Sequence, residues 1–236
     1  MTQFIVGLDV GQAQDFTAMA VLQRDVRASS DEPDSDGRTR WDDHYTVRAL
    51  ERPPLKTPYP DIVKRVVETL HHPRIDGQAE LVVDATGVGR PVVDMLRAAG
   101  CSPFPVTITG GQSVTMAEGY WGVPKRILVA SLAIALQTNR VHVVKKLALA
   151  DLLTREMLNF KVKINRHAND SYGEWRDGEH DDLVLSVALA VWWGERSAEG
   201  GFRHTALDEA KERRRLAFAD KTELPWWKAR APAHRR

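Results

Sequence analysis

Runs of apolar residues, alternating with polar ones, divide the first part of the chain into strands. The runs "FIVGLDV" at 4–10 and "TAMAVLQR" at 17–24 predict the two strands of a hairpin, and "HYTVRALER" at 44–52 predicts a third strand. Between the last two lies the polar segment 28–43, in which Gly, Pro, Ser and charged residues predict a loop. Three antiparallel strands in sequence order are the simplest arrangement of this region.

The middle of the chain alternates helical and strand patterns. Apolar residues at helical spacing predict a helix over 61–72, with Asp61 as its cap. The apolar run 79–84 predicts a strand, 89–100 a helix with a proline in its first turn, and 101–109 a further strand. A strand, a helix and a strand joined by tight connections imply parallel pairing.

The last third is predicted to be mostly helical. Beyond a loop over 110–122, the pattern predicts a helix at 124–139, a short extended piece at 140–144, a helix at 147–159, a hairpin made of "FKVKIN" and "SYGEWR", and an apolar helix at 180–196. The element order predicts an α/β protein with a ribonuclease H-like mixed five-stranded sheet, in which three antiparallel strands precede parallel strands and helices flank the sheet.

Length and composition allow one sizeable core. The chain has 236 residues, of which 43% are hydrophobic, and a formal net charge of +1. Residues 201–236 carry 10 Lys/Arg against 5 Asp/Glu, so we expect a folded domain over 1–200 and a basic C-terminal tail that is either flexible or docks on a partner.

Cysteine content and hydropathy bear on the compartment. One cysteine, Cys101, excludes an intramolecular disulfide and a multi-cysteine zinc site. No apolar run approaches the roughly 20 residues of a membrane span. We therefore expect no membrane association and a cytoplasmic location.

Aspartates stand at the ends of the predicted core elements. Asp9 lies in the first strand, Asp84 ends the fourth, and Asp181 with Asp182 opens the last helix. If the first strand neighbours the fourth, these carboxylates converge at one end of the sheet, where their repulsion requires cations. Oxygen ligands without cysteine favour Mg²⁺ or Mn²⁺, and two such ions can promote phosphodiester cleavage.

Four segments in order resemble the nuclease domain of phage terminase large subunits, the motor proteins of DNA packaging. They are "GLDVGQAQDFTAMAVL", "LVVDATGVGRPVVDMLRAAG", "VPKRILVASLAIALQTNRVHV" and "HDDLVLSVALAVWWGE", and the similarity runs from about residue 3 to 196. The resemblance implies a metal-dependent endonuclease that cuts concatemeric viral DNA. By motif, Asp9 and Asp84 match the family's first two acids, and Asp181 or Asp182, with Asp182 favoured, matches the third.

One feature of the family is missing from the sequence. A complete large terminase has an ATPase with a G-x-x-x-x-G-K-[ST] loop, and no such string occurs here. The resemblance therefore implies the nuclease part alone, acting on double-stranded DNA. A separate packaging ATPase, a small terminase subunit or a portal would be its partners.

Each candidate residue also has a simpler interpretation. Asp84 would cap the following helix, and Asp181 and Asp182 would complement a helix dipole. Asp15 is a turn former or an accessory ligand, and His180 a proton shuttle or an ordinary residue before a helix. The remaining candidates with two interpretations are Gly87 and Gly89 (phosphate approach or tight turn), Lys125 and Arg126 (phosphate clamp or solvated surface), and Trp192 and Trp193 (core rather than base stacking).

Two other functions fit parts of the sequence. The stretch from Asp9 to Thr17 resembles the phosphate-binding hairpin of actin and sugar-kinase-like phosphotransferases, although those proteins need two copies of the fold and no repeat is visible. A non-catalytic packaging or assembly module that docks through the basic tail is the other alternative.

Overall fold

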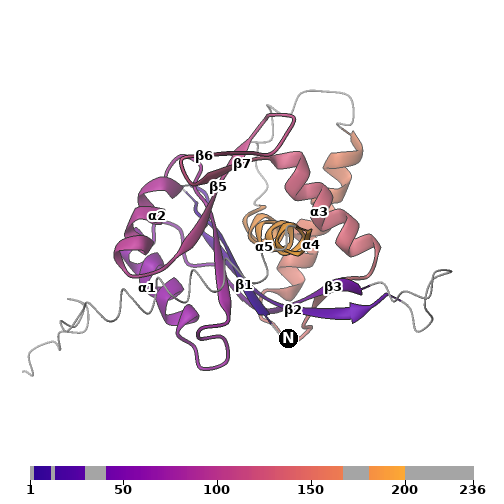
Figure 1. Cartoon of the computed structure of the whole chain (residues 1–236), viewed down its shortest axis with the longest axis horizontal. Coiled ribbons are helices and arrows are strands. Elements are labelled where there is room, and N and C mark those ends of the chain that lie inside the picture. The colour runs from indigo at the N-terminus through magenta and orange to yellow at the C-terminus, as the bar shows by residue number, and fades with distance from the viewer. Residues whose placement is uncertain (1–2, 12–13, 30–40, 167–180, 200–236) are drawn as a thin grey trace, which may run out of the picture.

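The computed structural model describes residues 3–11, 14–29, 41–166 and 181–199, and in these ranges eight strands form one mixed sheet. Their order across the sheet is β6-β7-β5-β4-β1-β2-β3-β8 (Figure 1). The strands are β1 (Gln3–Asp9), β2 (Ala18–Ala28), β3 (Trp41–Glu51), β4 (Ala79–Asp84), β5 (Pro103–Thr109), β6 (Thr115–Ala117), β7 (Tyr120–Pro124) and β8 (Val141–Val143).

The predicted fold class is confirmed by the five central strands. β1 pairs antiparallel with β2, and β2 pairs antiparallel with β3. On its other side β1 pairs parallel with β4, which pairs parallel with β5. This is the ribonuclease H-like arrangement that the element order predicted, and it makes β1 the centre of the sheet.

The sheet is wider than the five strands predicted. β7 adds parallel to β5, β6 adds antiparallel to β7, and β8 adds parallel to β3. β6 and β7 lie within the segment 110–122 and just after it, which was predicted to be a loop. The added strands pair the backbone groups at the open edges of β5 and β3, which a periodicity argument on the isolated segments does not detect.

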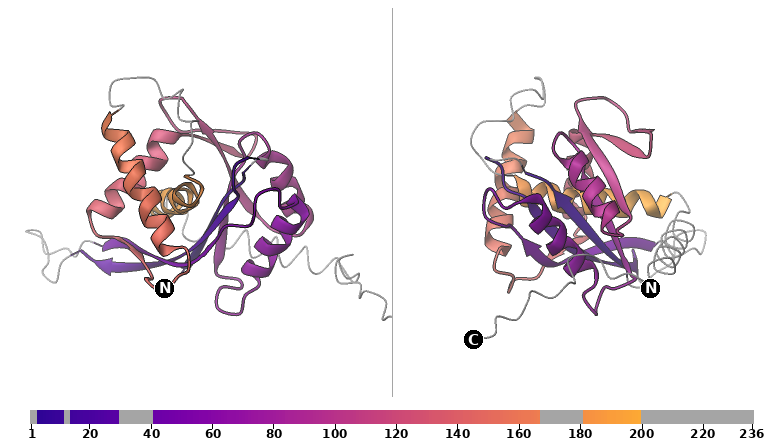
Figure 2. Two further views of the ribbon diagram at one scale, coloured as in Figure 1. Left: turned by 180° about the vertical axis from the view of Figure 1, so that it is seen from behind. Right: turned by 90° about the vertical axis from the view of Figure 1, so that its left-hand side faces the viewer.

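Helices cover both faces of the sheet (Figures 1 and 2). One apolar cluster joins the sheet to α1 (Tyr59–Leu70) and α2 (Gly89–Ala98). The other cluster joins the opposite face to α3 (Lys125–Gln137) and α5 (Asp182–Glu199), with α4 (Ala150–Arg166) packed against α5. Side chains alternate along β1, so that Ile5 belongs to the α5 side while Val6 and Leu8 belong to the α1 side.

Two helix predictions need correction. α1 begins at Tyr59 rather than Asp61, with Pro58 at its N-cap and Asp61 in its first turn. α4 continues to Arg166, so "FKVKIN" is helical and not the first strand of a hairpin. Phe160 and Ile164 continue the spacing of three to four residues from Met157, which favours the helix. The proposed partner strand 171–176 lies outside the described residues.

A close approach of α5 to β1 fixes the position of the last helix. A Cβ added at Gly7 would lie 1.9 Å from the backbone oxygen of Ser186, so only glycine allows this contact without a shift. Trp192 and Trp193 continue the same helix and are 3% and 4% exposed, which confirms them as core residues. Among the described helices, none is long and apolar enough to cross a membrane.

Candidate active site

Asp9 and Asp84 lie side by side at the carboxyl ends of two neighbouring strands. The parallel register of β1 and β4 ends with Leu8 opposite Val83, so the next residues of the two strands are these aspartates. Their side chains point toward α5, because each lies an even number of residues along its strand from Ile5 or Val82, which belong to the α5-side cluster. Both are less than 10% exposed, and their carboxyl groups are hydrogen-bonded to each other.

The packing of α5 on Gly7 directs the start of this helix toward the pair. Asp9 is two residues beyond Gly7 along β1, a distance of about 6.6 Å. Asp182 is four residues before Ser186 in α5, which is one turn or about 6 Å toward the helix N-terminus. These two steps lead to the same edge of the sheet, and the negative charge of Asp182 contributes to raising the pKa of Asp9.

Burial and like charges make Asp9 a poor anion. Its pKa is raised well above the usual value, first by burial and then by the charges of Asp84, Asp182 and Asp181, while Lys125 lowers it. The pKa of Asp84 is also raised by burial, but hydrogen bonds from the backbone N–H and the hydroxyl of Thr86 oppose this rise. The site thus concentrates negative charge that a cation would stabilise.

Asp181 and Asp182 are held by different cations. Lys125, the first residue of α3, places its Nζ 3.0 Å from Asp181 Oδ2 in a partly exposed pair. Arg52 donates from a terminal nitrogen to Asp182 Oδ2 at 2.8 Å, and the side chains of this second pair are 10% and 8% exposed. Asp182 is therefore the more deeply buried of the two, and the preference for it as the third cation ligand stays a prediction.

Arg52 and Glu156 belong to this region and were missed by sequence reasoning. Arg52 follows β3, and its other terminal nitrogen lies 3.3 Å from Glu156 Oε1. Glu156 comes from α4, 27 residues before Leu183, whose backbone N–H it accepts. An arginine at a strand end and a glutamate within a helix pattern carry no local signal, so only the packing of α4 on α5 reveals them.

The described residues do not contain a ready-made metal cage. Among them, no three or more His, Cys, Asp or Glu side chains are grouped so that they could hold a metal ion. The prediction that Asp9, Asp84 and one of Asp181 or Asp182 share divalent ions therefore stays a prediction. The chemistry of the group fits hard cations, because its donors are carboxylate oxygens that are buried and mutually repelling.

The simpler interpretation of Asp84 as a helix cap is wrong. The N-cap of α2 is Val88, and no side chain makes a capping hydrogen bond there. Gly87 adopts a positive φ of 55°, and a Cβ on Gly89 would lie 2.0 Å from the backbone oxygen of Asp84. These glycines thus serve the tight turn that follows Asp84, which is one of the two roles considered for them.

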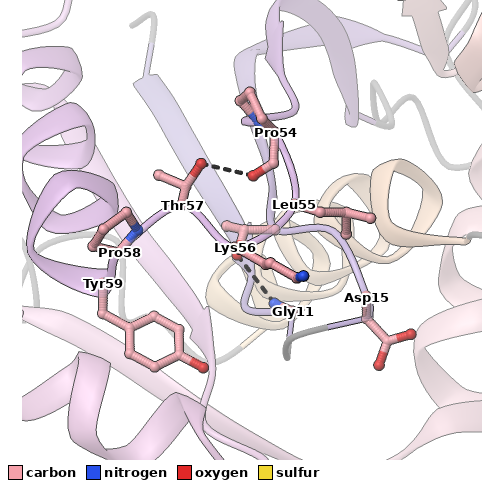
Figure 3. A pocket seen from close by; sticks show the side chains of 9 residues that line it. Gly11, Asp15, Pro54, Leu55, Lys56, Thr57, Pro58 and Tyr59 are labelled. Atoms are coloured by element: carbon pink, nitrogen blue, oxygen red, sulfur yellow. Dashed lines mark hydrogen bonds between the residues drawn. The ribbon is translucent and has the colours of Figure 1, made fainter.

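Asp15 lies on the turn between β1 and β2 and lines an open pocket. Figure 3 shows this pocket between Gly11, the Asp15 side chain and the segment 54–59 that precedes α1. The segment is braced by Thr57, whose hydroxyl donates to the backbone oxygen of Pro54 at 2.6 Å. Asp15 is exposed, and its role as an accessory ligand stays a prediction. His180 lies outside the described residues.

The two candidate DNA-binding cations have different surroundings. Lys125 faces the aspartates, since its charge lowers the pKa of both Asp9 and Asp84. Arg126 donates instead to the backbone oxygen of Gln112 and so supports the segment before β6. The basic tail 201–236 lies outside the described residues.

Comparison with known proteins gives matches to terminase large subunits. No protein-family model matches the chain. Over 206 residues, or 87% of its length, the chain is 23% identical to the terminase large subunits of Thermus phage G20c and of Thermus virus P23-45. It spans about a third of the length of these curated relatives, since the match covers 34% of each.

Two solved structures are similar in part. The large terminase nuclease from the thermophilic phage G20c is 22% identical, with a TM-score of 0.48 over 80% of this chain and 81% of that chain. The human cytomegalovirus terminase nuclease domain is 11% identical, with a TM-score of 0.42 over 81% of this chain and 83% of that chain. Over most of its length the chain is thus similar in sequence to terminase large subunits, as its four motifs predicted.

Proposed function

We propose that the chain is a divalent-metal-dependent DNA endonuclease of the terminase large subunit type. The observation that carries the proposal is the pair Asp9 and Asp84, two buried carboxyl groups on adjacent parallel strands whose pKa values are both raised. Folding places these acids together at an energetic cost, which a cation would offset. The sequence similarity to terminase large subunits points to the same activity.

In this proposal Asp9, Asp84 and Asp182 hold Mg²⁺ or Mn²⁺, with Asp181 as the alternative third ligand. When bound, one or two such ions activate water and stabilise charge on the leaving oxygen. Thr86 orients Asp84 through its two hydrogen bonds, which also favour the ionised form of this carboxyl group against the effect of burial. Lys125 favours the ionised form of both strand-end acids.

The proposed substrate is double-stranded DNA, as for the family that the chain resembles. Lys125 and Arg126 at the start of α3 would contact DNA phosphates, which gives affinity and register without sequence readout. We place the activity in genome packaging in the host cytoplasm. A packaging ATPase, a small terminase subunit or a portal would be its partners there.

Cleavage of supercoiled plasmid in the presence of Mn²⁺ tests the proposal. We expect nicked and linear products from the wild type, none in EDTA, and none from Asp9→Asn or Asp84→Asn. Hydrolysis of ATP without DNA cutting would favour the phosphotransferase alternative. Neither activity, from a protein that is folded by circular dichroism, would favour a non-catalytic assembly module.

A further inference from the structure

Arg52 bridges two carboxylates that come from different helices. One terminal nitrogen lies 2.8 Å from Asp182 Oδ2 of α5 and the other 3.3 Å from Glu156 Oε1 of α4. The guanidinium carbon lies 3.9 Å from the centroid of the Phe16 ring. The Phe16 ring packs on the flat face of the guanidinium group, and a carboxylate binds each of its two terminal nitrogens. Arg52 therefore has little freedom to turn away from Asp182.

Glu156 also fixes the backbone at the beginning of α5. Its Oε2 accepts the backbone N–H groups of Leu183 and Val184 at 3.2 and 3.4 Å. These are N–H groups of the first helical turn, which have no partner within the helix. A single buried carboxylate therefore contacts the arginine that binds Asp182 and the helix turn that carries Asp182.

We propose that Arg52 and Glu156 form a charge-neutral pair of positioning residues, which orients Asp182 toward the cation site without adding net positive charge there. This inference rests on the proposed function, in which Asp182 is a cation ligand. Neither residue is offered as a ligand or as a group that touches DNA.

The charges of Arg52 and Glu156 offset each other next to Asp182. An arginine beside a cation ligand orients the ligand by hydrogen bonds, but its own charge opposes a second cation nearby. A buried glutamate on the same guanidinium cancels that opposition. The side chains of Arg52 and Glu156 are only 10% and 6% exposed, so solvent screens this compensation weakly.

The opposing effects make the variants respond in different ways. Glu156→Gln removes the carboxylate that offsets the charge of Arg52 beside Asp182, so we expect Mn²⁺ binding to weaken by about tenfold. Arg52→Gln removes the orienting fork but leaves a negative charge, so Mn²⁺ binding should not weaken while turnover at saturating Mn²⁺ falls by about tenfold. The double variant Arg52→Gln/Glu156→Gln restores neutrality, and its Mn²⁺ affinity should return to within about threefold of the wild type.

The experiment measures Mn²⁺ binding by the electron paramagnetic resonance of free Mn²⁺ at pH 8.0, alongside plasmid cleavage, on the full chain. Burial raises the pKa of Glu156 to about 7, so at this pH it carries its charge. The matched controls Glu68→Gln and Lys64→Gln/Glu68→Gln alter an exposed ion pair on α1, across the sheet, and should leave affinity and turnover unchanged.

Recovery of Mn²⁺ affinity in the double variant would support the pair as a neutral unit. A merely structural role predicts the opposite, with the double variant weaker than Glu156→Gln, and that result would overturn the inference. Should Glu156→Gln fail to fold, Arg52→Lys gives the second test. It keeps the charge but loses the fork, and should lower turnover with unchanged affinity; unchanged turnover would overturn the inference.

The wild type separates this inference from the function on which it rests. A wild type that neither binds Mn²⁺ nor cuts DNA would overturn the proposed function, and the inference with it. If the wild type binds Mn²⁺ and cuts DNA, and the two single glutamine variants and the double variant match it in affinity and turnover, the inference is overturned while the proposed function stands.

Discussion

The carboxyl groups of Asp9 and Asp84 are hydrogen-bonded to each other across the parallel pair of β1 and β4, and burial raises the pKa of both. Two acids in this position destabilise the metal-free protein, because burial disfavours the ionised form of both and the charge of Asp84 further disfavours that of Asp9. The same arrangement supplies a cation with adjacent oxygen ligands.

Asp9→Asn tests the repulsion directly. The amide keeps the shape of the side chain and removes its charge, so the metal-free variant should be more stable than the wild type by roughly 1–2 kcal/mol at pH 8. The same variant should not cut DNA. Urea denaturation in EDTA measures the first effect and plasmid cleavage the second; a variant that is less stable and still cuts would contradict both expectations.

The stability gain should depend on pH. Because the pKa of Asp9 is higher in the folded protein than in the unfolded chain, the folded state binds the proton more tightly, and stability falls as pH rises above the ordinary aspartate pKa. Glu156, with a pKa raised to about 7, acts in the same direction and is common to both proteins. We expect the gap between Asp9→Asn and the wild type to be larger at pH 8 than at pH 5.5. An equal gap at both pH values would argue against a raised pKa for Asp9.

Lys125→Ala should weaken DNA binding and also shift the pH dependence of cleavage. In an Asp9→Asn background, loss of one phosphate contact should lower the slope of log affinity against log salt by about one, and Lys125→Ala/Arg126→Ala should lower it by about two.

In the active protein, Lys125→Ala should move the pH profile of cleavage upward, since Lys125 lowers the pKa of Asp9 and Asp84. Lys64→Ala, at an exposed lysine of α1, is the control for general charge loss.

Gly7→Ala should loosen α5 from the sheet. The new Cβ would collide with the backbone oxygen of Ser186, which cannot move without the helix, so we expect a loss of about 1–3 kcal/mol and weaker cleavage. Gly110→Ala is the matched control, because nothing lies within 4 Å of a Cβ at that position. Thermal denaturation compares the two variants. Equal stability would mean that the contact with Ser186 does not fix the helix.

The sequence allowed the central sheet and its acids to be predicted because both depend on local signals. Five apolar segments gave the strands, and the tight connections around 84–103 gave the parallel pairing of β4 with β5. The pairing of β1 with β4, which places Asp9 beside Asp84, was a condition of the ribonuclease H-like sheet that the element order predicted. Asp182 could be associated with this pair because its helix is apolar all round and must pack on the sheet.

Other parts depend on contacts between distant segments. β6 is three residues long and pairs with the edge of β7, which its own residues do not indicate. The extended piece predicted at 140–144 became β8, but its pairing with the edge of β3 was not predicted. Arg52 and Glu156 are 104 residues apart, and neither stands in a motif. Whether an acid faces a cation or a solvated surface depends on side-chain packing, which hydrophobic periodicity does not encode.

The most direct test of the proposed function is to locate Mn²⁺ by anomalous diffraction in crystals of the wild type grown or soaked with the ion. The account predicts an anomalous peak at the carboxyl ends of β1 and β4, with oxygens of both Asp9 and Asp84 about 2.1–2.2 Å from it and Asp182 or Asp181 as a further ligand. A well-ordered site with no peak there at saturating Mn²⁺, or with Mn²⁺ bound only by other residues, would contradict it.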